Sequence, residues 1–448
     1  MQKKIKELLN RKEVTFLQKV LGTDADLHIV GGAVRDLFLE KDPKDIDLAT
    51  KLTPQKVISK LEKNKVRYVP LGIRRGTIAA IVDHQSIEIT TFRNPQQEDV
   101  FTDSIEQDLP ARDFTINAIA ISVNTGKLID PFGGEQDLKK GILKTVGDPT
   151  LRFTEDPHRI LRLIRFGTGH GRVVEKATLE AAKKLSHLLQ HEKVERIGME
   201  FSKIMMLPTT SNCLREMNEL GILSIVLPEL IPCVGLEQNQ HHKLDVFEHT
   251  LSVVDNVEDY DNLKLKLAAL FHDIGKPESI TEVNGRRRMI GHELVSERIA
   301  KEAMTRLKYS NFMVECVTTL VRLHMKPIIG MKSGGIRRLI RDAGFLLEDW
   351  MALKKADILG GRNLDYDFEP TWKEFVDRVD YELYRTDVAA PKDPLEIGGK
   401  DIMSLGIPQG PVVGQVLALL REEVLEDPTL NKRDVLLVRA AEIAEKQL

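Results

Sequence analysis

The spacing of apolar positions divides the chain into a first part with mixed strands and helices and a longer helical part. Residues 1–22 have the pattern of a short amphipathic helix that ends near Gly22. Short β-rich runs then alternate with turns and helices over residues 27–150. From residue 151 onward nearly every segment has helical spacing, with proline and glycine only at breaks. The candidate strands are Leu27–Val30, Ile46–Ala49, Arg67–Pro70, Thr77–Val82, Ile87–Phe92, Ala118–Ser122 and Leu128–Ile129.

Length and pattern together predict an α+β protein with several domains. The 448 residues are too many for one ordinary core, and 42% hydrophobic with 30% charged residues is typical of globular proteins. We expect a mixed β-sheet with helices in the head, followed by an all-helical body. The expected parts are a leading helix at 1–26, the head at 27–150, a helical neck at 151–235, a second helical domain at 236–365 and a helical tail at 366–448.

Charge and cysteine usage indicate a cytoplasmic protein. Cys213, Cys233 and Cys316 lie far apart, as buried thiols do in a reducing compartment. No apolar run is long enough to span a membrane, and the basic N-terminus is not followed by a secretory signal.

The net charge of −3 excludes a wholly basic nucleic-acid coat but leaves room for a local basic groove. The sequence does not predict an oligomeric state.

An ordered pair of motifs in the first fifty residues predicts phosphate chemistry. Gly31 and Gly32 follow an apolar strand and open a helix, so that backbone N–H groups can approach a phosphate. Asp45 and Asp47 open the next expected strand, where alternate residues share one face. Two adjacent carboxylates repel each other and therefore commonly hold a divalent cation. A phosphate turn beside such a metal site favours phosphoryl or nucleotidyl transfer.

Five motifs in this order resemble the class II tRNA nucleotidyltransferase and poly(A) polymerase family, over residues 27–170. They are GGAVRD at 31–36, DIDLAT at 45–50, RDFTINA at 112–118, LIDPFGG at 128–134 with Asp137 and Leu138, and EDPHR at 155–159 continuing to Arg162 and Arg165. The resemblance implies template-independent addition of C and A to the 3′ end of tRNA, from CTP and ATP. The same motifs occur in poly(A) polymerases, which stay an alternative.

The resemblance also implies roles for individual residues. Asp45 and Asp47 would hold Mg²⁺ and act as the catalytic carboxylates. The implied nucleotide-binding residues are Gly32, Arg35, Arg112, Asp113, Asn117, Asp156, Arg159, Arg162 and Arg165. Asp113 would accept hydrogen bonds from a ribose, although an aspartate before Phe-Thr can equally cap a helix.

Asp156 and Arg159 are expected on one face of a helix at 155–166. A carboxylate accepts from the exocyclic amine of C or A, and a guanidinium donates to their ring acceptors. U and G present a carbonyl instead of the amine and would be rejected. The alternative is an ordinary salt bridge within the helix.

Two departures from the family pattern bear on specificity. Ala111 replaces the first arginine of the third motif, and only 18 residues separate Arg93 from Arg112. Family members that finish with A usually carry a longer flexible loop there, rich in Gly, Asp, Tyr and Arg. An enzyme that adds only the two C residues is therefore an alternative, with loop-length variation as the simpler explanation.

A second constellation resembles the HD phosphohydrolase superfamily. His272 and Asp273 end an apolar helix at Leu263–Phe271. The resemblance implies that His249, His272, Asp273 and Asp357 bind a divalent transition metal or Mg²⁺. His292, His324 and Lys276 are candidates for a second metal or a phosphate. The alternatives are histidines that merely fill helix interfaces, or a phosphohydrolase whose head only binds nucleotide.

Basic clusters in the helical body are candidates for RNA contact or ordinary solvated faces. They comprise Arg286–Arg288 and Arg337, Arg338 and Arg341.

Overall fold

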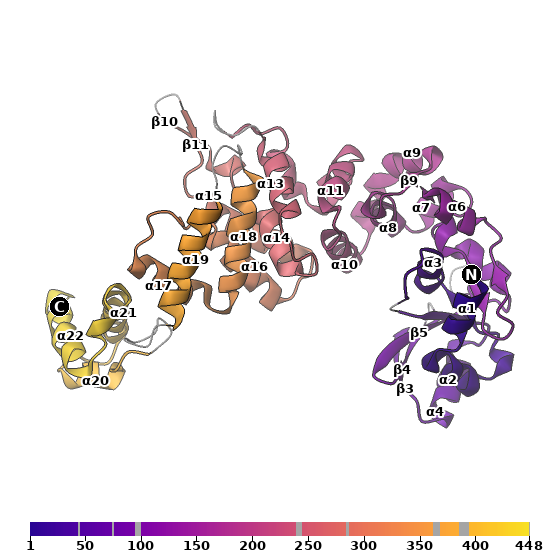
Figure 1. The fold of residues 1–448 in the computed structure, drawn as a ribbon, viewed down its shortest axis with the longest axis horizontal. Coiled ribbons are helices and arrows are strands. Elements are labelled where there is room, and N and C mark those ends of the chain that lie inside the picture. The colour runs from indigo at the N-terminus through magenta and orange to yellow at the C-terminus, as the bar shows by residue number, and fades with distance from the viewer. Residues whose placement is uncertain are drawn as a thin grey trace. The chain divides into compact units, whose positions relative to one another are not determined.

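The computed structural model describes residues 1–43, 45–73, 76–94, 100–238, 244–283, 286–361, 368–384 and 394–447 (Figure 1). Contacts divide the chain into two compact units, Met1–Pro228 and Glu229–Leu448. The finer division into five parts stays a prediction. Within these ranges, every helix is too short or too polar to cross a membrane.

A seven-stranded mixed sheet lies at the centre of the head, in the order β3-β4-β5-β2-β1-β6-β7. Neighbouring strands are antiparallel except β2 and β5, which are parallel. All seven predicted strands are confirmed, with ends that differ by no more than two residues. The strands are β1 (His28–Val30), β2 (Asp47–Thr50), β3 (Arg67–Gly72), β4 (Thr77–Val82), β5 (Gln85–Thr91), β6 (Ala120–Ser122) and β7 (Leu128–Ile129).

Four helices accompany the sheet: α3 (Gly32–Phe38), α4 (Pro54–Lys63), α5 (Ile105–Asp108) and α6 (Gly134–Lys140). One buried cluster joins Val30 of β1 and Ala49 of β2 to Phe92 after β5, Ile105 of α5 and Leu109. Burial of these apolar side chains stabilises the paired strands. It therefore fixes the end of β1 and the start of β2, where the two motifs meet.

The leading segment forms two helices, α1 (Gln2–Leu9) and α2 (Lys12–Leu21), so the expectation of one helix is wrong. The break lies at Asn10 and Arg11, and Arg11 has an extended ψ of 141°. Its guanidinium donates to the carbonyl of Pro43 at 2.7 Å and pairs with Asp42. These contacts with the loop before β2 hold Arg11 outside a continuous helix.

The rest of the first unit is mainly helical, as predicted. It comprises β8 (Ile142–Leu143), α7 (Pro149–Glu155), α8 (His158–Phe166), β9 (Val173–Val174), α9 (Lys176–Leu185), α10 (Val194–Met205), α11 (Thr210–Glu219) and α12 (Leu223–Val226). The helix expected at 155–166 is wrong at its start. Glu155 ends α7, and Pro157 lies at the N-cap of α8, so Asp156 lies between two helices.

In its described residues, the second unit is helical apart from the short hairpin of β10 (Thr281–Val283) and β11 (Arg286–Arg288). Its first helices are α13 (Val246–Asp255), α14 (Leu263–Phe271), α15 (His292–Arg306), α16 (Asn311–Leu323), α17 (Ser333–Ala343), α18 (Leu347–Gly360) and α19 (Glu369–Tyr384). Helix α14 packs against α13, α15, α16 and α18. Its residues from Leu265 to Phe271 are all buried, because α14 lies inside this group of helices.

The chain ends in three packed helices, α20 (Gly399–Ser404), α21 (Pro411–Glu426) and α22 (Arg433–Gln447). Ile402, Leu420 and Leu436 are buried in their shared core. The arginine cluster of α17 faces this tail. Buried Arg337 pairs with Glu382 at 2.8 Å and donates to two backbone carbonyls of α21, and Arg338 pairs with Glu422. These guanidinium groups are occupied by protein partners, as in an ordinary ion-paired face.

Candidate functional site

The glycine turn lies where β1 passes into α3. Gly31 has a φ of +68°, in the left-handed region that glycine adopts without strain. A Cβ atom at Gly31 would lie 3.6 Å from Oδ2 of Asp47 and 3.7 Å from Nη1 of Arg112. The turn therefore brings bare backbone close to one carboxylate and one guanidinium.

Three carboxylates gather beside this turn. Asp47 begins β2, whereas Asp45 lies in an exposed bend before it, so the expectation that both belong to one strand is wrong. The parallel register places Glu88 of β5 directly beside Asp47. Burial and the charge of Glu88 raise the pKa of Asp47 to about 6, with Arg112 opposing. A nearby cation would stabilise the ionised form of such a carboxyl group.

Asp113 is the centre of a buried polar network. Its Oδ1 accepts hydrogen bonds from the backbone N–H of Phe114 at 2.9 Å and from Nδ2 of Asn117 at 3.0 Å. Its Oδ2 accepts from Arg162 at 2.6 Å, and Asn117 in turn accepts from Nη1 of Arg35 at 2.9 Å. The alternative of a helix cap is not borne out, because Phe114 is the N-cap of the 3-10 turn Thr115–Asn117. The network instead links α8 to α3.

Asp156 and Arg159 do not form the helical pair that the spacing predicts. Arg196 of α10 contacts both oxygens of Asp156, at 3.0 and 3.1 Å. Burial opposes ionisation of Asp156, but the hydrogen bond and charge of Arg196, together with the charge of Arg159, lower its pKa. Arg159 donates to the carbonyls of Ala111 at 2.8 Å and Arg152 at 3.2 Å. The two side chains are thus held separately, each by its own partners.

Helix α10 supplies two residues that the sequence reasoning missed. Besides Arg196, it carries Glu200, which is buried and pairs with Arg165 at 2.5 Å. The available signal was their spacing of four, which puts Arg196 and Glu200 on one face of a helix. Together they anchor both ends of the segment that runs from Asp156 through α8.

All the predicted residues of the head line one cleft of about 810 Å³. Among the residues that the structure describes, nine lysine and arginine side chains line it, against six aspartates. The cleft is therefore a local basic groove in a chain whose net charge is −3. The predicted residues are Gly32, Arg35, Asp45, Asp47, Arg112, Asp113, Asn117, Asp156, Arg159, Arg162 and Arg165.

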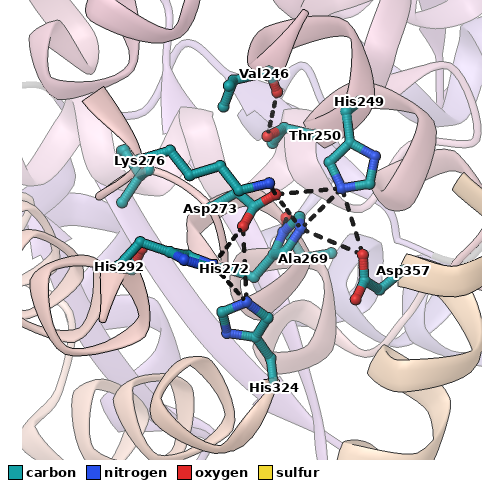
Figure 2. A network of polar contacts seen from close by, with 12 residues as sticks. Val246, His249, Thr250, Ala269, His272, Asp273, Lys276, His292, His324 and Asp357 are labelled. Carbon is teal, nitrogen blue, oxygen red and sulfur yellow. Dashed lines mark hydrogen bonds and ion pairs between the residues drawn. The ribbon is translucent and has the colours of Figure 1, made fainter. Parts of the chain in front are cut away.

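The second constellation also comes together, at the ends of several helices of the second unit (Figure 2). It forms two groups of three residues, and within each group the candidate ligand atoms lie within 4.8 Å of one another. One group is His249, His272 and Asp357, and the other is Asp273, His292 and His324. Asp273 joins the groups, since its Oδ2 lies 3.1 Å from Nε2 of His272 and its Oδ1 lies 3.1 Å from Nε2 of His292. The predicted ligands and the predicted second-metal candidates thus share one centre.

The histidine rings are oriented as metal ligands require. Nδ1 of His272, His292 and His324 each lies 2.6–2.8 Å from a backbone carbonyl one turn earlier. Each Nε2 therefore faces the centre (Figure 2), the arrangement that second-shell hydrogen bonds give to bound imidazoles. Four imidazoles and two carboxylates suit a divalent transition metal or Mg²⁺ at either group.

The charges of this centre depend on one another. Burial opposes protonation of His249, but Asp273 and Asp357 raise its pKa to about 9. Burial likewise opposes ionisation of Asp357, yet His249 and His272 hold its pKa well below the ordinary value. Lys276 lies 2.6 Å from Oδ2 of Asp273. The two carboxylates thus favour positive charge at His249, as they would favour a bound metal ion.

Comparison with known families agrees with this geometry. Residues 27–144 match the poly A polymerase head domain, 173–233 match the probable RNA and SrmB- binding site of polymerase A, and 244–360 match the HD domain. A CC-adding tRNA nucleotidyltransferase of Thermus thermophilus is 32% identical over 92% of this chain and 92% of its own length. The chain belongs to the tRNA nucleotidyltransferase and poly(A) polymerase family.

Other relatives in this family carry different names. An A-adding tRNA nucleotidyltransferase of Deinococcus radiodurans is 33% identical over 71% of this chain and 75% of its own length. A CCA-adding enzyme of Anoxybacillus flavithermus is 37% identical over 55% of this chain and 62% of its own. The chain is thus similar to relatives named for CC addition, for A addition and for CCA addition.

Solved structures of the family share the fold. A CCA-adding enzyme of Bacillus stearothermophilus in complex with CTP aligns over 100% of this chain and 99% of its own, with a TM-score of 0.72 and 24% identity. A CCA-adding enzyme complexed with ATP aligns over 98% of both chains, with a TM-score of 0.64 and 19% identity. The α+β fold with a helical body is therefore confirmed.

Proposed function

We propose that this chain is a nucleotidyltransferase that adds C or A, or both, to the 3′ end of tRNA from CTP and ATP. The observation that carries the proposal is that the glycine turn, the paired aspartates and the Asp156–Arg159 segment line one cationic cleft. A cytoplasmic location, in keeping with three unpaired buried cysteines, belongs to the same proposal.

In this proposal Asp45 and Asp47 hold a divalent cation, with Glu88 adding negative charge beside them. Mg²⁺ bound there would stabilise negative charge on the α-phosphate as the 3′-hydroxyl attacks. Arg35, Arg162 and Arg165 bind the triphosphate and orient its pyrophosphate group for departure.

Asp156 and Arg159 choose the base in this proposal. Two of the accepting positions of Asp156 are taken by Arg196, which leaves the others for an exocyclic amine. Asp113 accepts from Phe114, Asn117 and Arg162, so a ribose hydroxyl would have to replace one of these donors. We therefore assign Asp113 to positioning Arg162 as well as to the ribose.

Single-nucleotide extension of a tRNA transcript that lacks its last three residues tests the proposal. The transcript is incubated with CTP, with ATP, with both, and with UTP or GTP. We expect C to be added from CTP, A to follow or to be absent, and UTP and GTP to be refused. No addition from CTP or ATP, on this transcript or on one ending in CC, would overturn the proposal, and a long A tail would indicate a poly(A) polymerase.

Addition of C alone is the second candidate. The 18-residue stretch between Arg93 and Arg112 favours it, as does the CC-adding relative that matches nearly the whole chain. Residues 95–99 of this stretch lie outside the described part of the chain. With both nucleotides present, a stop after two residues supports addition of CC, and a third residue supports complete CCA addition.

We also propose that the HD centre hydrolyses phosphate esters, with a divalent transition metal or Mg²⁺ at His249, His272, Asp273 and Asp357. The clustering of five candidate ligand side chains around Asp273 supports this. The test is phosphate release from a tRNA with a 3′-phosphate, or ring opening of a 2′,3′-cyclic phosphate to the monoester, before and after chelation and with Mn²⁺ or Ni²⁺ returned. Release should require metal and His272, whereas His187→Ala, at an exposed histidine, should leave it unchanged.

A further inference from the structure

Phe166, the last residue of α8, lies among three guanidinium groups. The Cζ atoms of Arg165, Arg35 and Arg162 lie 4.0, 4.9 and 5.1 Å from its ring centroid. The ring is 3% exposed. Guanidinium groups within about 6 Å of an aromatic centroid are attracted by the ring's quadrupole, more strongly where water is excluded. Phe166 therefore contacts all three cations that we assign to the triphosphate.

These three cations would otherwise repel one another. Arg162 has a carboxylate partner in Asp113, and Arg165 has one in Glu200. Arg35 comes from a different helix, α3, and donates to the neutral amide of Asn117 at 2.9 Å, with Asp36 farther away at 3.4 Å. The ring is thus the contact that all three guanidinium groups share, across the junction of α3 and α8.

The surroundings of Phe166 keep the ring itself in place. Phe114 meets it edge-on at 6.1 Å, and His170 stacks on it at 6.1 Å with the planes 24° apart. Burial, Arg172 and Arg35 lower the pKa of His170 to about 4. His170 is therefore neutral at pH 7 and adds no fourth positive charge to the cluster.

We propose that Phe166 is a positioning residue for the triphosphate: its ring holds Arg35, Arg162 and Arg165 together before the nucleotide arrives. The inference rests on the proposed function of the cleft. Cations that are already in place lose less conformational freedom when the anion binds. Weakening the ring's quadrupole should therefore weaken binding of the triphosphate and of free pyrophosphate, and leave base choice unchanged.

Fluorinated phenylalanines at position 166 test the proposal without changing the shape of the side chain much. Mono-, di- and trifluoro-phenylalanine progressively weaken the quadrupole. Across the series we expect the KM for CTP and the Ki of inorganic pyrophosphate to rise together, reaching about five- to tenfold. The kcat should change less than threefold, and the preference for CTP over UTP should be unchanged. F166L, which removes the ring, should show at least the same loss if it folds.

The same fluorinated series at Phe153 is the matched control. Phe153 is fully buried in the neighbouring helix α7, and no cation lies over its ring within the described residues. The inference would be overturned if the KM and Ki did not change across the series at position 166, or if they changed equally at both positions. A loss confined to kcat would also overturn it. Calorimetry measures pyrophosphate binding directly, even if the wild-type chain fails to extend tRNA. A failure of this inference can therefore be distinguished from a failure of the proposed function.

Discussion

Asp113 is buried in the head cleft, and its charge depends on Arg162. Burial opposes ionisation, but Arg162 and Asn117 lower the pKa of Asp113 to about 2. A carboxyl group with a lowered folded-state pKa stabilises the fold above its ordinary value of 3.8. That contribution is lost as the pH falls through about 2.

Removing the cation from this pair should destabilise the first unit. Arg162→Met leaves Asp113 buried without its partner, and we expect a loss of about 3 kcal/mol at pH 7. Urea unfolding measures the loss. The double variant D113N/R162M should recover part of it, whereas Arg67→Met, at an exposed arginine of β3, should stay within about 0.5 kcal/mol of wild type. Equal losses in R162M and the double variant would contradict the role of the charge.

Metal binding at the HD centre should release a proton. Asp273 and Asp357 raise the pKa of His249 to about 9 against the opposing effect of burial, so that His249 is protonated at pH 7 in the metal-free chain. A raised histidine pKa stabilises the fold below the ordinary value of 6.5, and this contribution is lost as the pH rises through about 9. A metal ion needs the neutral imidazole and must displace the proton.

Calorimetry in buffers of different ionisation enthalpy measures this release. Binding of Mn²⁺ at pH 7.5 should release about one proton, and the release should vanish well above pH 9. The variant D357N removes one of the two carboxylates that raise the pKa and should release less. A binding enthalpy that does not change with the buffer would contradict the prediction.

At the scale of elements, the HD centre depends on close packing between the end of α14 and the start of α15. Gly275 donates from its backbone N–H to Oγ of Ser296 at 2.8 Å. A Cβ atom at Gly275 would lie 2.4 Å from the backbone nitrogen of Ser296 and 2.7 Å from the carbonyl oxygen of His292. Both contacts are with backbone, which cannot move aside as a flexible side chain can.

Gly275→Ala should therefore shift α15, and with it His292, away from His272 and Asp273. We expect a loss of about 1–3 kcal/mol in stability and at least a tenfold loss in Mn²⁺ affinity. Gly414→Ala in α21 is the control, because nothing lies within 4 Å of a Cβ atom there and alanine favours a helix by about 0.5–1 kcal/mol. Wild-type metal affinity in G275A would show that the contact does not position His292.

The elements that the sequence predicts well are those with a local signal. Short β-rich runs between turns predicted all seven strands, and the apolar run at Leu263–Phe271 matched α14. The sequence analysis missed two helix breaks. Arg11 leaves the helix for Pro43 and Asp42, and Pro157 begins a new helix after Asp156.

The candidate sites show the same limit. Motifs placed every predicted head residue in one cleft, because each motif is a short continuous segment. Glu88 depends on the register between β2 and β5, and Arg196 depends on how α10 packs against α8. No local sequence pattern predicts either relation. The residues that surround the predicted site residues are therefore known only from the fold.

At the scale of the whole molecule, each site is built from one compact unit alone. The head cleft draws its residues from 31 to 203, within Met1–Pro228, and the HD centre draws its ligands from 249 to 357, within Glu229–Leu448. A ligand stabilises the unit that binds it by RT ln(1 + [L]/Kd), so the stabilisation grows with the logarithm of the ligand concentration above Kd. CTP with Mg²⁺ should therefore raise the unfolding temperature of the first unit, and Mn²⁺ at low concentration should raise that of the second.

Variants at the two sites should separate the two activities. D45N/D47N should lower nucleotide addition by about 10³-fold, because it removes the carboxylates that would hold the catalytic cation, and should leave metal-dependent phosphate release within twofold of wild type. H272A should do the reverse. Asp103→Asn, at an exposed aspartate of the head outside the cleft, controls for the loss of negative charge. If H272A also slowed nucleotide addition, the two sites would be coupled, and the HD centre would have to be considered part of the transferase; independent losses would make this chain two enzymes acting on the same end of one RNA.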